Sequence, residues 1–264
     1  MSANQMKLGR CLLRHGNLNI VSLIFGTRRT ILADARKSVM LGVRLAEFRA
    51  DLSMNSTQGD FSKIVGTLKE LRKECPSLAL IGTIRQFVQY GSYRGTEADR
   101  LDAFEKMIPF LDAIDIELVA DQIQKRVIGL AREQGKTVIV SHHAIFDMPS
   151  TKQLGRWAAA AGKLEPDLVK LSLKGRTTQD LERLLAFTRQ FVSERPTPAL
   201  VTLLVGEPKL ALASRIACPL AGSALTYGVP RQSFLSRTLG IPNIKELLSA
   251  KELRHEFSRA MAIA

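Results

Sequence analysis

The sequence predicts an α/β fold, a single-domain (β/α)₈ TIM barrel, on three observations. Its 264 residues match the roughly 250 residues of such a barrel. Eight short apolar or β-branched runs alternate with segments of helical periodicity, which is typical of parallel strands joined by helices. The segment after the first run, GTRRT, lacks the Gly-x-Gly-x-x-Gly spacing of an open dinucleotide-binding sheet. We therefore expect the closed barrel rather than an open doubly wound sheet.

The eight expected strands are short and spread along the whole chain. They lie at 19–26, 43–51, 78–85, 113–120, 137–144, 167–175, 199–206 and 221–228. The clearest helical patterns between them are 62–74 and 177–194, where apolar residues recur every three or four positions. Thr177 is a candidate N-cap of the second helix, and Asp180 would complete an acidic form of the capping box.

The flanking segments complete one expected domain over residues 1–264. Residues 1–18 form an N-terminal extension, whose apolar run is too brief for a signal peptide. The long polar stretch 229–242 follows the eighth strand, where a loop of this length is typical of a lid. We expect the last helix, 243–262, to pack across the bottom or side of the barrel.

The composition argues against several other functions. The formal charge is +13, but lysine and arginine are scattered, and aromatic residues are only 6% of the chain, with Trp157 the sole tryptophan. Binding of single-stranded nucleic acid uses aromatic stacking platforms, so we expect no nucleic-acid partner. The three cysteines lie far apart and predict no metal site. No run approaches the ~18 apolar residues of a membrane span, so we expect a cytoplasmic protein without a membrane partner.

Polar side chains gather at the ends of the expected strands. Active sites of these barrels form at the C-terminal ends of the strands, and alternate residues of a strand share a face. The residues on one face of strands two to six are Glu47, Arg49 and Asp51; Arg85; Asp115 and Glu117; Ser141 and His143; and Lys170, Ser172 and Lys174. A buried ion-pair network would use the same residue types, so the pattern alone leaves a structural role open.

Lys170 and His143, on neighbouring expected strands, suit imine chemistry. A lysine in a partly desolvated pocket near other cations has a lowered pKa, so part of it is free amine at neutral pH. A free amine condenses with a ketone, and the protonated imine acidifies the neighbouring C–H bond. A histidine whose pKa lies near neutrality can take that proton and deliver it to a leaving hydroxyl. We therefore expect these two residues to be the reacting pair.

Seven short motifs follow one another along the chain: EFRAD at 47–51, TIR at 83–85, DIEL at 115–118, SHH at 141–143, Lys170-x-Ser172, SR at 214–215 and GSALTYG at 222–228. In this order and spacing they resemble the motifs of the type I 3-dehydroquinate dehydratases, and the resemblance extends from about residue 19 to 248. The resemblance implies a (β/α)₈ barrel, usually a homodimer, that uses no metal and no organic cofactor. It implies a small carboxylate substrate, 3-dehydroquinate, and a place in the shikimate pathway towards chorismate and the aromatic amino acids.

The resemblance also implies a role for each matching residue. Lys170 would be the Schiff-base lysine. His143 would be the general acid and base that removes the proton next to the imine and assists loss of water, giving 3-dehydroshikimate. Arg215 would bind the substrate carboxylate, for which a planar guanidinium is suited. The other substrate-binding positions would be Ser22, Glu47, Arg49 and Arg85, with Ser236 or Arg237 in place of a serine of the family lid.

Several positions depart from the family pattern. Gln89 stands where the family usually has a glutamate close to the catalytic histidine. A carboxylate there would favour the imidazolium and an amide would not, unless Glu117 substitutes. Leu203 and Val205 replace two methionines of the seventh strand. The lid reads SRTLGIPN, with Ile241 at the position of the family's glutamine.

These observations leave three functions open. The first is an active dehydratase. The second is another imine-forming barrel, such as a class I aldolase acting on a phosphorylated sugar, in which backbone N–H groups at Gly222 and Ser223 would bind the phosphate. The third is a catalytically impaired relative that survives as a binding or interaction protein, which Gln89 and the altered lid favour.

Overall fold

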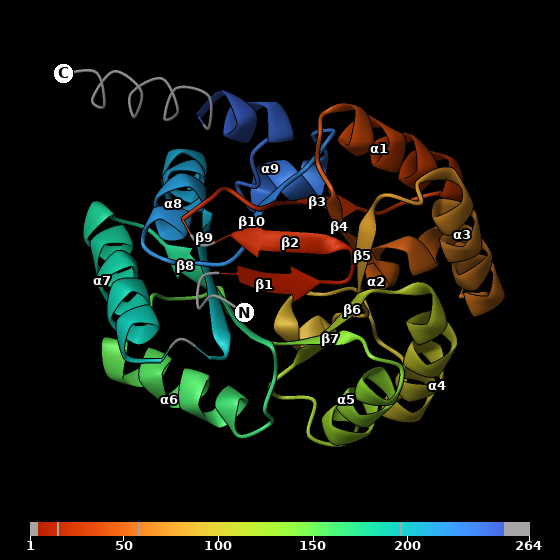
Figure 1. Cartoon of the computed structure of the whole chain (residues 1–264), viewed down its shortest axis with the longest axis horizontal. Helices are drawn as coiled ribbons and strands as arrows, with labels where there is room; N and C mark the ends of the chain where they lie inside the picture. The colour runs from red at the N-terminus through yellow and green to blue at the C-terminus, as the bar shows by residue number, and fades with distance from the viewer. Residues whose placement is uncertain (1–4, 15, 58, 196, 251–264) are drawn as a thin grey trace.

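The computed structural model describes residues 5–14, 16–57, 59–195 and 197–250. Eight parallel strands form a nearly closed barrel, and helices surround it as an outer ring (Figure 1). The strands are β3 (Ile20–Ile24), β4 (Leu45–Arg49), β5 (Ala79–Thr83), β6 (Ala113–Glu117), β7 (Thr137–Ala144), β8 (Leu168–Gly175), β9 (Ala199–Gly206) and β10 (Thr226–Gly228). They pair in the order β10-β3-β4-β5-β6-β7-β8-β9. The predicted (β/α)₈ barrel is confirmed.

Helices connect the strands and cover the outside of the barrel. They are α1 (Arg28–Met40), α2 (Ala50–Ser53), α3 (Phe61–Glu74), α4 (Glu97–Met107), α5 (Gln124–Glu133), α6 (Thr151–Gly162), α7 (Thr178–Glu194), α8 (Pro208–Leu220) and α9 (Phe234–Thr238), with 3₁₀ turns η1 (Met54–Thr57), η2 (Phe87–Gln89) and η3 (Ile108–Phe110). Helix α7 begins as predicted. The Thr177 hydroxyl accepts from the Asp180 N–H, and the Asp180 carboxylate accepts from the Thr177 N–H. This capping box satisfies two N–H groups at the start of the helix.

The predicted strands agree with the observed ones in place and order. β7 and β9 have the predicted bounds. β10 is shorter than predicted because residues 221–225 form the C-cap of α8 and a turn. The second predicted strand ends at Arg49, so Asp51 lies in α2 and not on the strand.

A seam separates β9 from β10, which do not pair as strands in the described part of the chain. Near the start of β9, two hydrogen bonds join this strand to the residues that precede β10. The Ala224 N–H donates to the Leu200 carbonyl, and the Ser223 hydroxyl accepts from the Thr202 N–H. The barrel is thus closed here by groups outside the strand ladder, which leaves room for a side chain to enter between the strands.

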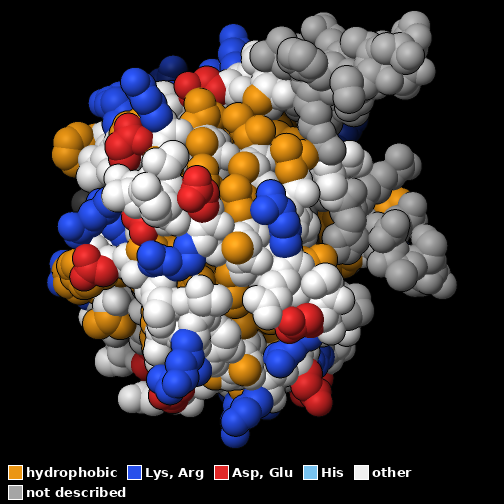
Figure 2. All heavy atoms as spheres, turned by 90° about the vertical axis from the view of Figure 1, so that its left-hand side faces the viewer, with side chains coloured by type: hydrophobic (Ala, Val, Ile, Leu, Met, Phe, Trp, Pro, Cys, Tyr) orange, Lys and Arg blue, Asp and Glu red, His pale blue; other side chains and the backbone are white. Residues whose placement is uncertain are grey.

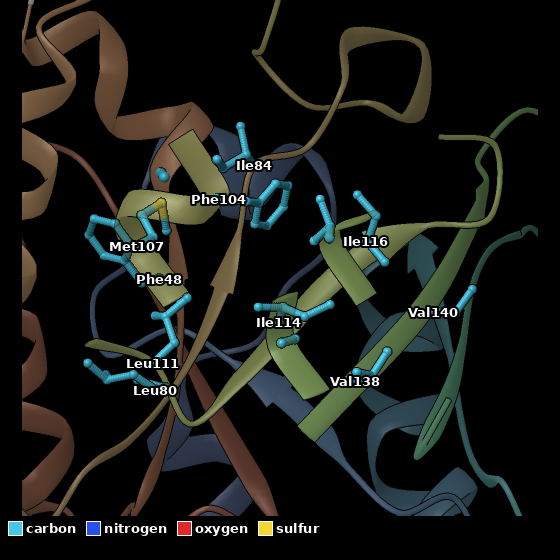
Figure 3. Close-up of a cluster of buried hydrophobic side chains, with 14 of the residues drawn as sticks. Phe48, Leu80, Ile84, Phe104, Met107, Leu111, Ile114, Ile116, Val138 and Val140 are labelled. Atoms are coloured by element: carbon cyan, nitrogen blue, oxygen red, sulfur yellow. The ribbon is translucent and has the colours of Figure 1, made fainter. Parts of the chain in front are cut away.

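Alternate residues of the strands pack in two separate layers. Inward residues fill the barrel, and they include Val21, Leu45, Ala79, Ala113, Ile139, Leu168 and Val201. Outward residues pack against side chains of the helices, and Figure 3 labels residues of both kinds in this outer layer: Phe48, Leu80, Ile84, Phe104, Met107, Leu111, Ile114, Ile116, Val138 and Val140. Phe48 is fully buried there, so β4 turns its charged residues to the inside.

The N-terminal extension forms a β-hairpin that the sequence analysis did not predict. β1 (Gln5–Leu8) and β2 (Cys11–Arg14) pair antiparallel, and Gly9 between them has a φ of 54°. Leu8 and Leu13 pack on the apolar residues that fill the barrel at the end where the strands begin. The hairpin lies across the centre of the barrel in Figure 1. It therefore covers the N-terminal end and leaves the opposite end for a site.

The segment after β10 is more regular than the polar loop that the sequence predicts. It contains the short helix α9, whose N-cap Ser233 forms a capping box with Ser236. After α9 the chain lies on the end of β9, where the Gly206 N–H donates to the Leu239 carbonyl at 3.0 Å. This contact places the residues after α9 at the C-terminal end of the barrel.

The last described residues, 244–250, are helical. Ile244 and Leu247 are buried against Leu18 and Ile20, near the start of β3. This is the bottom and side of the barrel, as expected for the final helix. Residues 251–262 of that predicted helix lie outside the described residues.

Charged side chains are spread over the surface rather than gathered in one patch on the face that Figure 2 shows. On this face, which includes α7, lysine and arginine side chains alternate with acidic ones, and apolar side chains form a band across the middle. No helix among the described residues is both long enough and apolar enough to cross a membrane.

Candidate active site

A small cavity lies at the C-terminal ends of the strands, away from the hairpin. Its volume is about 70 Å³. Its charged and polar lining is Glu47, Arg49, Arg85, Gln89, Tyr90, His143, Lys170, Ser172, Arg215 and Tyr227. Its apolar lining is Leu23, Ile145, Leu203, Val205, Leu239 and Ile241. The structure thus brings Lys170, His143 and most of the predicted binding residues into one space.

Lys170 projects from β8 into this cavity, with its ammonium held between two carboxylates. Nζ lies 2.8 Å from Glu47 Oε2 and 2.9 Å from Asp115 Oδ2, and the side chain is 5% exposed. Burial lowers the pKa of a lysine, but the two carboxylates outweigh it and hold the pKa of Lys170 above its ordinary value. The expected lowering of the Lys170 pKa is therefore wrong. That expectation considered the neighbouring cations and not the two carboxylates that contact the amine.

Asp115 connects Lys170 to Arg85. Its Oδ1 lies 3.0 Å from Arg85 Nη2 and also accepts from the Ser141 hydroxyl. Burial raises the pKa of Asp115, but Arg85 and Lys170 lower it more. The pKa therefore lies well below its usual range, and the carboxylate stays ionised. The Tyr227 ring centroid lies 4.2 Å from Nζ of Lys170 and covers another side of the ammonium. These contacts fix the amine in position.

His143 is oriented by an arginine and not by a carboxylate. Nη1 of Arg85 lies 3.1 Å from Nδ1 of His143. A guanidinium has no acceptor, so Nδ1 accepts this bond and the neutral ring carries its proton on Nε2. Burial, and then the charges of Arg85 and Lys170, lower the pKa of His143 well below its ordinary value. The imidazole is therefore neutral at pH 7 and presents an N–H donor.

Gln89 contacts the backbone of His143 and not its ring. Its Oε1 accepts from the His143 N–H at 2.9 Å. Glu117 does not substitute for a carboxylate at this position. It pairs with Arg100 and lies 3.8 Å from Arg85, so it supports the arginine rather than the imidazole. The family's carboxylate beside the histidine has no counterpart in these contacts.

Arg49 is fixed at the cavity wall by Asp51. Nε and Nη2 of Arg49 donate to the two carboxylate oxygens of Asp51 at 2.8 Å and 2.7 Å. Asp51 also accepts from the Ser92 N–H at 3.0 Å. Burial lowers the pKa of Arg49, but Asp51 offsets this, so the guanidinium stays charged. A bidentate pair of this kind orients the guanidinium for a ligand.

Arg215 enters the cavity through the seam between β9 and β10. It lies in the middle of α8, not at a helix start, and donates from Nε to the Tyr227 carbonyl at 3.0 Å and from Nη1 to the Leu204 carbonyl at 2.6 Å. Burial lowers the pKa of Arg215 to about 10. No carboxylate of the described residues pairs with it, and its Nη2 has no hydrogen-bond partner among them. A buried cation without an anion, lining a cavity, is suited to bind an anionic ligand group.

Three predicted binding residues do not line the cavity. Ser22 faces outward, with its Oγ 2.7 Å from Oγ of Ser38 in α1. Ser236 is buried within the α9 turn, where its hydroxyl bonds Gln232 and the N-cap residue. Arg237 is exposed and borders a separate surface hollow. Strand alternation accounts for Ser22, and the capping box accounts for Ser236.

The phosphate site considered for an aldolase is not supported by the structure. Gly222 packs against Val192 of α7. The Ser223 hydroxyl accepts from the Thr202 N–H and donates to the Leu225 carbonyl. Both residues lie outside the barrel and neither lines the cavity that holds Lys170.

No role was predicted for four side chains that the structure places around the amine and over the cavity: Asp115, Tyr227, Leu239 and Ile241. Asp115 was expected to face the same way as Glu117, and Ile241 was noted at the position of the family's glutamine. For Leu239 there was no signal, because it follows a short helix in a segment without periodicity. In the described ranges, no group of three or more His, Cys, Asp or Glu side chains is arranged to hold a metal ion.

Comparison with known proteins points to one family. The family model of the type I 3-dehydroquinases matches residues 19–258. The chain is 30% identical over 222 residues to the 3-dehydroquinate dehydratase of Geobacillus thermodenitrificans, covering 83% of this chain and 84% of that one. It is 30% identical over 212 residues to the enzyme of the same name from Methanococcoides burtonii, covering 80% and 86%. The fold is similar to that of a 3-dehydroquinate dehydratase from Geobacillus kaustophilus, with a TM-score of 0.87 at 22% identity over 98% of this chain and 100% of that one.

Proposed function

The chain belongs to the type I 3-dehydroquinase family, and from this premise we propose that it is a 3-dehydroquinate dehydratase, a hydro-lyase that converts 3-dehydroquinate to 3-dehydroshikimate and water. The observation that carries the proposal is the shared cavity of Lys170, His143 and Arg215. They supply an amine for the ketone, a proton carrier and a cation without an anion, which are the groups that this elimination needs.

The reaction begins with an imine between the substrate ketone and Lys170. Glu47 and Asp115 raise the pKa of the amine, so only a small fraction of it is a nucleophile at neutral pH. The protonated imine carries its positive charge on the same nitrogen. The two carboxylates therefore stabilise this intermediate by the same interaction that disfavours the free amine.

His143 carries a proton between two substrate atoms. It takes the proton from the carbon next to the imine and returns it to the hydroxyl that leaves as water. In the structure Nδ1 accepts from Arg85 and the neutral ring holds its proton on Nε2, so the ring has no free lone pair. The bound substrate must therefore take over the Nη1 donor of Arg85, which frees one ring nitrogen for the transferred proton.

Arg215 binds the substrate carboxylate. Two of its donor atoms are occupied by backbone carbonyls on either side of the seam, and Nη2 is available to the ligand. The carboxylate would supply the counter-charge that the buried guanidinium lacks. Charge-assisted hydrogen bonds of this type are about twice as strong as neutral ones.

The substrate needs more space than this cavity provides. A volume of about 70 Å³ is far below the ~300 Å³ or more of a typical ligand pocket. Leu239 and Ile241, which follow α9, form part of the wall. We therefore assign the lid role to residues 229–242, which open to admit the ring and close over it with apolar side chains.

The same family membership supports the wider expectations. The enzyme would act in the shikimate pathway towards chorismate and the aromatic amino acids, in the cytoplasm and as a homodimer. Light scattering of the purified chain tests the oligomeric state, with a mass near twice the 29.2 kDa of one chain expected. A mass of one chain would contradict the dimer.

Incubation with 3-dehydroquinate tests the function directly. At pH values between 7 and 9 we expect the ultraviolet absorbance of a conjugated enone to increase with time as the product forms. Lys170→Met should abolish it, and the matched variant Lys174→Met, on the same strand, should retain it. An absence of enone at any pH between 6 and 9 would show that the chain has lost this catalysis, and turnover of sugar phosphates would indicate an aldolase instead.

A further inference from the structure

Ser172, on β8, presents a hydroxyl in the cavity wall that has no hydrogen-bond partner among the described residues. The residue is 4% exposed and lines the cavity. Its Oγ bonds to no residue in the described part of the chain, whereas the hydroxyl of Ser141 bonds both Arg85 and Asp115. Because a nearly buried hydroxyl is stabilised only when it is hydrogen-bonded, this group is positioned for a ligand.

The strand register fixes where this hydroxyl lies. Ser172 is the pairing partner of His143 on β7 and of Leu203 on β9. Neighbouring strands are about 4.8 Å apart, so the hydroxyl lies beside the imidazole at the same height in the barrel. Lys170 is two residues earlier on the same strand face, one layer below. Ser172 thus borders both members of the reacting pair.

Above the layer of Lys170, the rest of the wall between His143 and Arg215 is apolar. The lining residues of this arc are Ile145, Leu203 and Val205 from the strands and their ends, with Leu239 and Ile241 above them. Among the described residues of the arc, Ser172 is the uncharged side chain that can donate a hydrogen bond. A polar substituent that points at this arc therefore has Ser172 as its available partner.

We propose that Ser172 is a further catalytic residue, which binds the hydroxyl that leaves as water. The proposal rests on the dehydratase function. In 3-dehydroquinate the leaving hydroxyl and the carboxylate share one carbon, and this carbon is two bonds from the ketone carbon. With the ketone carbon on Lys170 and the carboxylate on Arg215, the leaving hydroxyl lies on the arc between His143 and Arg215.

The chemical step needs a donor at this position. The C–H bond next to the imine breaks first, its proton goes to His143, and its electron pair forms an enamine. The enamine electrons then form the new C=C bond while the C–O bond breaks. The imidazolium proton goes to the departing oxygen and water leaves, with the positive charge again on the imine nitrogen. Ser172 donates a hydrogen bond to that oxygen throughout and transfers no net proton.

Ser172→Ala and the hydroxyl-retaining variant Ser172→Thr separate this role from a structural one. Three quantities are measured with 3-dehydroquinate in D₂O: borohydride trapping of the imine, deuterium uptake next to the ketone in recovered substrate, and water loss. In Ser172→Ala we expect water loss to fall roughly 10- to 100-fold, as for loss of one hydrogen bond to a charged group. Trapping should stay within twofold of the unaltered protein and deuterium uptake should not fall, because both precede cleavage of the C–O bond.

Ser172→Thr should retain water loss to within about threefold. Wild-type water loss in Ser172→Ala, or an equal fall in all three quantities, would overturn the role of Ser172 while leaving the dehydratase function in place. Failure of the unaltered protein to form an imine on Lys170 would overturn the dehydratase function itself. Thermal unfolding of both variants shows whether either loses activity through loss of structure.

Discussion

Arg85 donates a hydrogen bond from Nη1 to Nδ1 of His143 across 3.1 Å. Arg85 is itself held by Asp115 and Ser141, and it is 2% exposed, so this contact is set by a buried network. The contact fixes the proton of the neutral imidazole on Nε2 and places a permanent positive charge beside the ring. His143 is therefore poised as a neutral donor until the substrate changes the position of Arg85.

The first prediction concerns the charge of His143. Because burial and Arg85 lower its pKa, we expect the ring to stay neutral at pH 6. The unfolded chain, with an ordinary histidine pKa of about 6.5, then binds the proton first as the pH falls. The contribution of His143 to the free energy of unfolding is thus complete above about pH 6.5. Below that pH the contribution is lost, by at most about 1.4 kcal/mol per pH unit.

NMR titration of the histidine ring protons tests this prediction, with His143→Asn to assign the signal. A ring that titrates at pH 6.5 or above would show that Arg85 does not control it. Chemical unfolding of the two proteins at pH 7 and pH 5 should show a smaller loss of stability for the variant.

The second prediction concerns Gln89. Gln89→Glu keeps an oxygen for the His143 N–H but adds a negative charge near the ring. We expect this charge to raise the pKa of His143 and to move the acidic limb of the rate profile to higher pH. Gln89→Ala, the matched variant without the oxygen, should lower kcat without moving that limb. An unchanged profile in Gln89→Glu would mean that position 89 acts on the backbone alone.

The third prediction concerns the amine. Because Glu47 and Asp115 raise the pKa of Lys170, the rate of borohydride trapping should increase with pH through the alkaline range, about tenfold per unit, as free amine forms. Glu47→Gln removes one of the two carboxylates, so the trapping rate should reach its alkaline plateau at a lower pH. The same variant should slow water loss, because the protonated imine loses a counter-charge. Identical pH profiles for both proteins would contradict the ion pair.

The fourth prediction concerns Arg215. Arg215→Lys keeps a positive charge but loses the planar fork, so we expect KM for 3-dehydroquinate to rise roughly 10- to 100-fold, with a smaller change in kcat. The thermal midpoint should also fall, because Arg215 joins β9 to β10 through two carbonyls. A lower midpoint with an unchanged KM would show that the residue is purely structural.

The fold could be predicted because each strand carries its own signal. Apolar runs bounded by helical periodicity located β7 and β9 to the residue, and the Thr177 cap located the start of α7. The hairpin β1–β2 was not predicted, because two four-residue strands joined by Gly9 give too short a pattern. Helix α9 was not predicted either, because it is short and lies in a segment whose sequence resembles a loop.

The candidate site could be predicted where strand alternation determines direction. Lys170, His143 and Glu47 face inward because their strands bury the alternate residues against helices. Ser22 was assigned by resemblance alone, and alternation turns it outward. The pKa of Lys170 was predicted in the wrong direction, because its sign depends on which charges lie within 3 Å, and the sequence does not show distances between strands.

Borohydride reduction in the presence of 3-dehydroquinate, followed by peptide mapping, shows whether Lys170 forms the imine. We expect one added label per chain, on Lys170, because this amine lies in the cavity beside His143 and is fixed by Glu47 and Asp115. A label on Lys174 would mean that the neighbouring amine of the same strand is the nucleophile. No label on either lysine, under conditions where the protein is folded, would contradict imine catalysis by this barrel.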